Sequence, residues 1–151
     1  MQSKSGYNRL RVLLFIGLLA IGTSAIAQAA ASEQGSYRCS NRTLNGSYGF
    51  LLDGTDLGTG FPFRGVVMQT YDGKGGITQV DHVIFNGMIP PVEWAPGTGT
   101  YSVNADCTGS AVLHTPSNGD VALHFVVTDN GKQIKQVVDA NAVTAVGNRV
   151  N

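Results

Sequence analysis

Polar and apolar residues alternate in short runs along the chain beyond residue 44. The runs are rich in Val, Thr, Tyr, Phe and Ile, and turns of Gly, Asp and Asn separate them. An alternation with a period of two puts every second side chain on one face of a strand, and no apolar set recurs with the longer period of a helix. The pattern predicts an all-β domain with a β-hairpin over 99–113 and strands over 48–52, 61–71, 77–85, 120–128, 133–139 and 143–149.

The connections between these strands are mostly short turns, such as 72–76 and 129–131. Short turns pair consecutive strands antiparallel, so about eight strands form one continuous sheet. Closing that sheet removes its two exposed edges, and we therefore expect a single antiparallel up-and-down β-barrel. A β-sandwich is the alternative. It needs a long crossover, and only the connection 86–98, which holds the single tryptophan, is long enough.

The first 29 residues have the features of a secretory signal peptide. Lys4, Arg9 and Arg11 precede an apolar run over 12–21, and small residues follow at Ala25, Ala27 and Ala29. The apolar run is too short to span a bilayer, which argues against the alternative of an uncleaved anchor. We expect cleavage after Ala29, or less favourably after Ala27, and export to the periplasm or the extracellular space. The expected organisation is a signal peptide over 1–29, a flexible lead-in over 30–43 and a β-barrel domain over 44–151.

Cleavage changes the charge of the chain, because the signal peptide holds three of the ten basic residues and none of the ten acidic ones. The mature chain is mildly acidic, with its charges scattered along the sequence. It has no basic patch for nucleic acid or for an anionic membrane surface, so we expect neither partner after cleavage. About 120 residues are enough for one domain with a core and too few for two. The sequence leaves the oligomeric state open.

The chain has two cysteines, Cys39 and Cys107. In an exported protein they are most simply interpreted as one disulfide, which would tie the start of the barrel domain to the turn of the central hairpin. Two free thiols or a cysteine-based metal site are the alternatives. The metal site lacks further ligands, because no histidine lies at ligand spacing from either cysteine.

Six polar or aromatic residues are candidates for a ligand-binding site: Arg64, His82, Glu93, Trp94, Tyr101 and His124. An arginine, a carboxylate and an aromatic ring in a pocket would bind a small ligand with a polar head and an apolar body. If His82 and His124 met inside the barrel, with Asp81 or Glu93 beside them, they would form an acid–base pair or a metal site. The alternative is that both histidines and Arg64 face solvent, because the opposite strand faces are more continuously apolar.

Motifs that would assign an activity are absent from the sequence. It has no G-x-S-x-G elbow, no P-loop, no dinucleotide fingerprint and no H-x-H or H-E-x-x-H spacing. We therefore predict no metal and no cofactor, and no catalytic residue is assigned.

A resemblance rests on three stretches of the mature chain: Cys39 with 44–50, then 71–75, then 99–109. They are similar to turn-and-strand signatures in a group of small exported bacterial proteins of unassigned function. The resemblance implies a small barrel like the calycin and allene-oxide-cyclase-like barrels. It carries no catalytic residue over to this chain.

Three functions remain open on these grounds. The first is a non-enzymatic exported barrel that binds a small apolar or amphipathic ligand in its interior, which a core filled by its large apolar side chains would exclude. The second is an isomerase or cyclase, which requires the polar candidates to converge inside the barrel. The third is a structural or envelope-interaction module, which predicts a filled core and an exposed apolar patch over 88–94.

Overall fold

The computed structural model describes residues 37–116 and 119–150, and they form eight strands and two single-turn 3-10 helices. The signal-peptide prediction lies outside these residues. No helix in the described part of the chain has the length and apolar character to cross a bilayer. In chain order the elements are η1 (Asn41–Thr43), β1 (Asn45–Thr55), β2 (Pro62–Asp72), β3 (Gly76–Phe85), β4 (Ala95–Val103), β5 (Thr108–Thr115), β6 (Gly119–Thr128), η2 (Asp129–Gly131), β7 (Gln133–Val138) and β8 (Ala142–Arg149).

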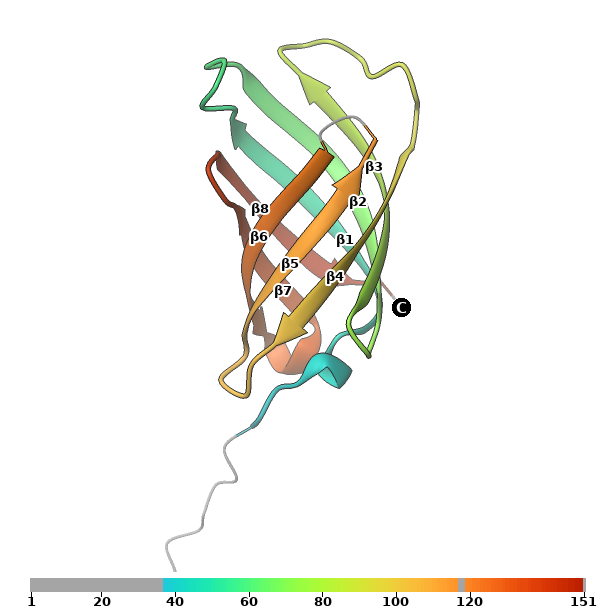
Figure 1. Ribbon diagram of the computed structural model, residues 1–151, viewed down its shortest axis with the longest axis vertical. Coiled ribbons are helices and arrows are strands. Elements are labelled where there is room, and N and C mark those ends of the chain that lie inside the picture. Colours follow the sequence, from blue (N-terminus) through green and yellow to red (C-terminus); the bar gives the residue numbers. More distant parts are fainter. Residues whose placement is uncertain (1–36, 117–118, 151) are drawn as a thin grey trace, which may run out of the picture. The chain divides into compact units, whose positions relative to one another are not determined.

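The eight strands make one closed up-and-down barrel (Figure 1). Each strand pairs antiparallel with the next, and β1 closes the ring by pairing antiparallel with β8 from Tyr48↔Arg149 to Thr55↔Ala142. The predicted fold is confirmed, and the sandwich alternative is wrong because no strand crosses between two sheets. In this topology the turns before β3, β5 and β7 share one end of the barrel, and the turns before β2, β4, β6 and β8 share the other.

Alternate residues of each strand point into the barrel, as the sequence pattern predicts. The inward positions of β1 are Tyr48, Phe50 and Leu52, which are all buried, while Leu51 between them is exposed. The same alternation continues around the ring and gives one core rather than two. Removing apolar side chains from water is the main force that fixes this register, because a slip of one residue would expose the whole inward set.

One end of the barrel is packed shut. Tyr48, Tyr71 and Tyr101 form a chain of edge-to-face rings with centroids 5.4 and 5.0 Å apart. Leu44 and Ile134 pack there with no exposed surface. Edge-to-face aromatic pairs contribute about 0.5–1.5 kcal/mol each beyond the area they bury. This closed end is therefore the well-packed half of the core.

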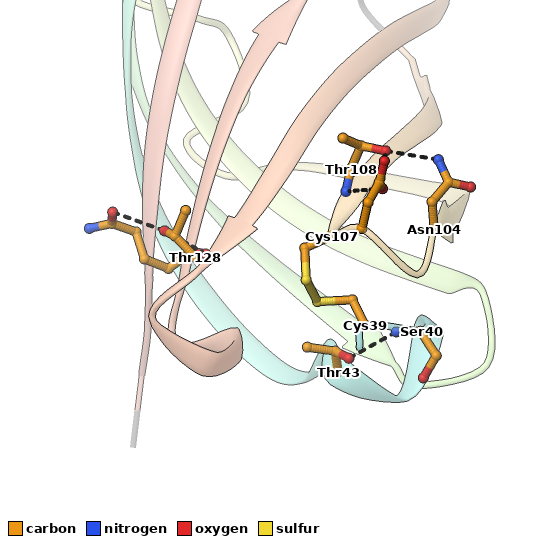
Figure 2. The surroundings of a disulfide bond; sticks show 9 residues. Cys39, Ser40, Thr43, Asn104, Cys107, Thr108 and Thr128 are labelled. Atoms are coloured by element: carbon orange, nitrogen blue, oxygen red, sulfur yellow. Dashed lines mark hydrogen bonds between the residues drawn. A yellow bond between two sulfur atoms is a disulfide. The ribbon is translucent and has the colours of Figure 1, made fainter. Parts of the chain in front are cut away.

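The predicted disulfide between Cys39 and Cys107 is confirmed, and it lies at the closed end (Figure 2). It joins the segment before η1 to the turn between β4 and β5, across 68 residues of sequence. The Tyr101 hydroxyl donates to the backbone oxygens of Asn41 and Leu44, both at 2.9 Å. These contacts hold the end of the predicted lead-in against the floor of the barrel.

Two glycines make room for the largest apolar side chains of the core. Gly147 lies opposite Phe50 in the β1–β8 ladder, and Gly109 lies opposite Phe125 in the β5–β6 ladder. A Cβ atom on either glycine would come within 2.4 Å of the facing ring. An aromatic ring lying over a cross-strand glycine fills the space that the glycine leaves, which favours close packing in this layer.

The structure differs from the sequence prediction at the start of β4. The strand begins at Ala95, so the β3–β4 connection is shorter than the loop expected over 86–98. Pro96 pairs with Val80 at an exposed position near the beginning of the strand, where its missing N–H is tolerated. Gly97 faces inward, and a Cβ atom there would come within 2.9 Å of the Gln79 side chain. The Pro and Gly that suggest a loop therefore belong to a strand.

Candidate functional site

The half of the barrel away from the disulfide encloses a chamber of about 310 Å³. Its walls are mainly apolar and come from strands around the whole ring: Leu52, Phe63, Val67, Val83, Phe85, Leu113, Val121, Leu123, Val138 and Val143. Polar residues also line it: Asp56, Gln69, Gln79, Asp81, Thr115, Asp120, Gln136, Asp139 and Asn141. The chamber has the mixed character of small-molecule sites, which are mostly apolar with a few placed polar groups.

A ladder of hydrogen bonds runs along the chamber wall from the closed end towards the opening. The Tyr71 hydroxyl donates to Gln69 Oε1 at 2.7 Å, and Gln69 Nε2 donates to Gln79 Oε1 at 3.1 Å. Gln79 Nε2 then donates to Asp81 Oδ2 at 2.9 Å. An ionised carboxylate only accepts, so it fixes the orientation of both amides and of the tyrosine hydroxyl. Every donor in the ladder therefore points towards Asp81.

Asp81 is the acidic group at the end of this ladder. It faces inward on β3 and is partly buried. Burial raises the pKa of its carboxyl above the usual 3.8, and the hydrogen bond from Gln79 and the nearby His82 oppose that change. The carboxylate is therefore partly stripped of water, and among the described residues its one side-chain hydrogen bond comes from Gln79.

Gln136 lines the chamber and carries a buried acceptor without a partner in the described part of the chain. It lies on β7, which is diametrically opposite β3 in a ring of this order. The residue is 6% exposed, and its Oε1 atom is buried with no hydrogen-bond partner in the described part of the chain. Leaving a buried acceptor unpaired costs about 1–3 kcal/mol. Since the last torsion of a glutamine is soft, a turn of the amide presents either of its ends to the chamber.

A second cavity, of about 550 Å³, adjoins the chamber below the β3–β4 connection. We call it the vestibule. Its lining is apolar and proline-rich, with Met88, Ile89, Pro90, Pro91 and Val92 from the connection. It shares Phe63, Asp81, Val83 and Phe85 with the chamber. Asp81 therefore lies where the two cavities meet.

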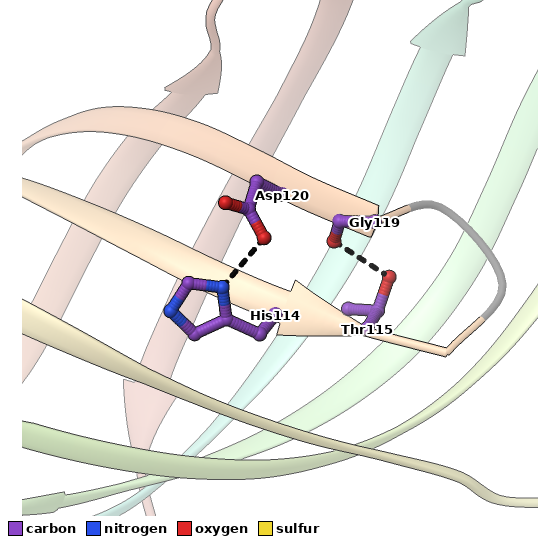
Figure 3. A network of polar contacts seen from close by, with 4 residues as sticks. All are labelled: His114, Thr115, Gly119 and Asp120. Atoms are coloured by element: carbon purple, nitrogen blue, oxygen red, sulfur yellow. Dashed lines mark hydrogen bonds and ion pairs between the residues drawn. The ribbon is translucent and has the colours of Figure 1, made fainter.

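Two histidine–aspartate pairs lie near the rim of the chamber. His114 Nδ1 contacts Asp120 Oδ1 at 2.6 Å across the β5–β6 ladder, close to the contact of Thr115 with the Gly119 oxygen (Figure 3). His124 Nδ1 contacts Asp139 Oδ1 at 2.9 Å. In both pairs the histidine is well exposed, so solvent screens the interaction and its contribution to stability is small.

Two of the residues predicted for a ligand site lie on the outer face of the barrel. Arg64 forms an ion pair with Asp53 of the neighbouring strand β1, and both side chains are about two-thirds exposed. His124 points outward from β6 to its partner Asp139. Neither residue lines the chamber or the vestibule.

The structure brings three other predicted residues together beside the rim, outside the chamber. His82 Nδ1 contacts the Glu93 backbone oxygen at 2.6 Å, and the His82 and Trp94 rings are 6.1 Å apart. These contacts pin the end of the β3–β4 connection to the outer face of β3. Tyr101 is at the opposite end of the barrel, in the closed floor, where burial raises the pKa of its hydroxyl to about 12.

Sequence reasoning missed the three glutamines and ranked Asp81 only as an accessory group. A signal was present, because Gln69 and Gln136 each stand between two apolar residues at inward spacing: Val67, Tyr71, Ile134 and Val138. A polar residue within an inward series indicates either a buried hydrogen bond or a ligand contact. The two glutamines turn out to differ, since Gln69 is paired and Gln136 is not.

This difference predicts opposite effects of the same substitution. Gln136→Met removes an unpaired buried amide and keeps the side-chain volume, so we expect the free energy of unfolding to rise by about 1 kcal/mol. Gln69→Met leaves the Tyr71 hydroxyl and the Gln79 oxygen without partners, so we expect a decrease of about 1–3 kcal/mol. Urea unfolding of both variants and the wild type measures the changes. A destabilised Gln136→Met variant would mean that the amide is paired in solution.

The raised pKa of Asp81 predicts a pH dependence of stability. The folded protein holds this proton more tightly than the unfolded chain, so stability falls as pH rises from about 3.8 through the folded-state pKa. Asp81→Asn removes that penalty and keeps an acceptor for Gln79. We expect the variant to be more stable than the wild type at pH 7 and the difference to shrink towards pH 4. Urea midpoints across this range test the prediction, and a difference that does not vary with pH would contradict it.

Together, fold and site define a small closed barrel with an interior chamber of mixed apolar and polar lining that continues into an apolar vestibule. Searches of protein-family models, curated proteins and solved structures find no match to this chain.

Proposed function

We propose that this protein is an exported, non-enzymatic binding protein that holds a small, mainly apolar ligand in the barrel chamber. The observation that carries the proposal is the Gln136 Oε1 atom, which is buried without a hydrogen-bond partner among the described residues, in the wall of a chamber whose other inward glutamines are paired. A partner for that atom is the simplest reason to keep it there. The signal-peptide pattern and the resemblance to small exported bacterial barrels support export.

The size and division of the interior also support this proposal. Packed tyrosines and phenylalanines fill the closed half of the barrel. This packing stabilises the fold, so the chamber in the other half need not be filled by side chains. The chamber and vestibule have volumes of about 310 and 550 Å³, which fall in the usual range for small-ligand sites. The structural-module alternative predicts a filled core and an exposed apolar patch over 88–94. Met88, Ile89, Val92 and Trp94 are exposed as it predicts, but the chamber leaves the core unfilled, so it is the weaker proposal.

The first test uses uncharged probes, so that it depends on the cavity alone. The purified, oxidised protein is titrated with 1-octanol and with 2-phenylethanol while Trp94 fluorescence and heat of binding are followed. We expect saturable binding of one molecule per barrel and a rise in melting temperature with ligand concentration. An unchanged melting temperature and no heat with these probes and with their amine and carboxylate analogues would overturn the proposal.

A second candidate is an isomerase or cyclase that uses Asp81 as a general base. The observation in its favour is a partly buried carboxylate in a chamber, with a pKa raised by burial. The polar residues that the sequence suggests for such an enzyme do not line either cavity: Arg64, His82, Glu93, Tyr101 and His124. Product analysis of any ligand that binds distinguishes the two candidates, because a binding protein returns the ligand unchanged.

A further inference from the structure

We propose that the ligand carries a protonated amine, and that this group binds the Asp81 carboxylate where the chamber and the vestibule meet. The inference rests on the proposed function and deepens it. It assigns a charge and a head group to a ligand whose body is apolar.

The charges around the two cavities are of one sign. Four aspartates line the chamber: Asp56, Asp81, Asp120 and Asp139. Among the described residues, neither cavity is lined by a lysine, arginine or histidine. Such an interior attracts cations and repels carboxylates, since like charges in close contact cost several kcal/mol. A fatty acid or another organic anion is therefore a poor fit.

Three of these aspartates have other partners. Asp120 and Asp139 contact histidines on the outer face, and Asp56 accepts hydrogen bonds from Thr59 in the β1–β2 turn. Of these four aspartates, Asp81 is the one that lines both cavities. The residues paired with Asp81 on the two neighbouring strands are Val67 on β2 and Ala95 on β4. His82 is close enough to lower the pKa of Asp81, but its side chain lies on the opposite face of β3. Asp81 is thus the carboxylate at the junction of the two cavities, and its side-chain hydrogen bond comes from the neutral Gln79 amide.

The ladder of hydrogen bonds orients the Asp81 carboxylate and leaves it able to accept further hydrogen bonds from a cation. It supplies a single donor to Oδ2 and ends there, so the carboxylate is oriented but not saturated with hydrogen bonds. An ammonium group brings three N–H donors and a full charge, and hydrogen bonds between two ionised groups are about twice as strong as neutral ones. Gln136, on β7 opposite β3, lines the same chamber and adds a neutral polar group to its wall.

The vestibule suits the apolar body of the ligand. Its residues on the β3–β4 connection are largely apolar, and Met88, Ile89 and Val92 are 61%, 78% and 52% exposed. Covering such side chains with a ligand body removes apolar area from water. An amine at Asp81 with a body of alkyl or aromatic carbon thus matches both the charge at the junction and the lining beside it.

The test compares matched ligands that differ in one head group. Butyl, octyl and 2-phenylethyl bodies are each used as the amine, the alcohol and the corresponding carboxylate, and affinities are measured by isothermal titration calorimetry at pH 7. For at least one body we expect the amine to bind about tenfold or more tightly than the alcohol, and the carboxylate most weakly. In Asp81→Asn the amine should lose at least about tenfold in affinity while the alcohol changes by less than about twofold. Asp53→Asn, the same substitution on the outer face of β1, is the control and should leave all affinities unchanged.

Each outcome has a distinct meaning. If, for every body that binds, the alcohol or the carboxylate binds as tightly as the amine, the amine inference is overturned and the binding function stands. An amine preference that persists in Asp81→Asn also overturns it, because the charge would then be recognised elsewhere. Absence of binding by the whole set overturns the binding function itself.

Discussion

Removal of the Cys39–Cys107 disulfide is expected to lower the free energy of unfolding by about 4 kcal/mol, a large part of the 5–15 kcal/mol of a typical domain. The bond closes a loop of 68 residues, and in the chain-entropy model a loop of this length restricts the unfolded chain strongly. The native contacts beside the bond would also weaken, because Cys39 directly precedes η1 and the buried Leu44 that close the floor of the barrel.

Urea unfolding of the Cys39→Ala/Cys107→Ala double variant measures this effect. Reduction of the wild-type protein with dithiothreitol is the matched control, since it breaks the same bond without changing the side chains that pack around it. We expect the two to agree and the urea midpoint to fall in both. A loss below about 1 kcal/mol would mean that the hydrogen bonds from Tyr101 to Asn41 and Leu44 hold the floor without the covalent link.

The barrel was predictable because local signals agree along the whole chain. Tight turns such as 72–76 and 129–131 impose antiparallel neighbours, and large apolar side chains at every second position of β1 and β6 favour one inward face. The start of β4 was not predictable in the same way. Pro96 and Gly97 have loop character by composition, and only the pairing with β3 explains why a strand accepts them there.

The chamber could not be predicted from the same signals. The empty volume inside the barrel is what the inward side chains of all eight strands leave unfilled, and no local sequence pattern encodes it. The pairing of Gln69 with Gln79 depends on the β2–β3 register, which sets the two residues directly opposite each other. Alternation alone also did not decide which face of β3 points into the barrel. In the structure His82 lies on the outer face, while its neighbours Asp81 and Val83 line the chamber.

Blocking the junction between chamber and vestibule is expected to abolish ligand binding without unfolding the barrel. Val83 is partly buried and lines both cavities. Val83→Trp therefore places an indole ring at the junction of the two cavities, beside Asp81 and Phe85. Because this ring enters existing space, we expect the cost in stability to stay at or below the 1–3 kcal/mol typical of overpacking. The affinities for the amine and alcohol probes should fall by about a hundredfold or more.

The matched control for this experiment is Val80→Trp. Val80 lies on the same strand, points outward and is 39% exposed, so the same indole is added to the protein without entering either cavity. Calorimetry gives the affinities, and circular dichroism with urea unfolding shows whether both variants are folded. Unchanged binding by a folded Val83→Trp variant would place the ligand outside the barrel, with the exposed side chains of the β3–β4 connection as the alternative site. Loss of binding in Val83→Trp but not in Val80→Trp would locate the ligand at the junction where the Asp81 carboxylate lies, because of these two positions only Val83 lines the cavities.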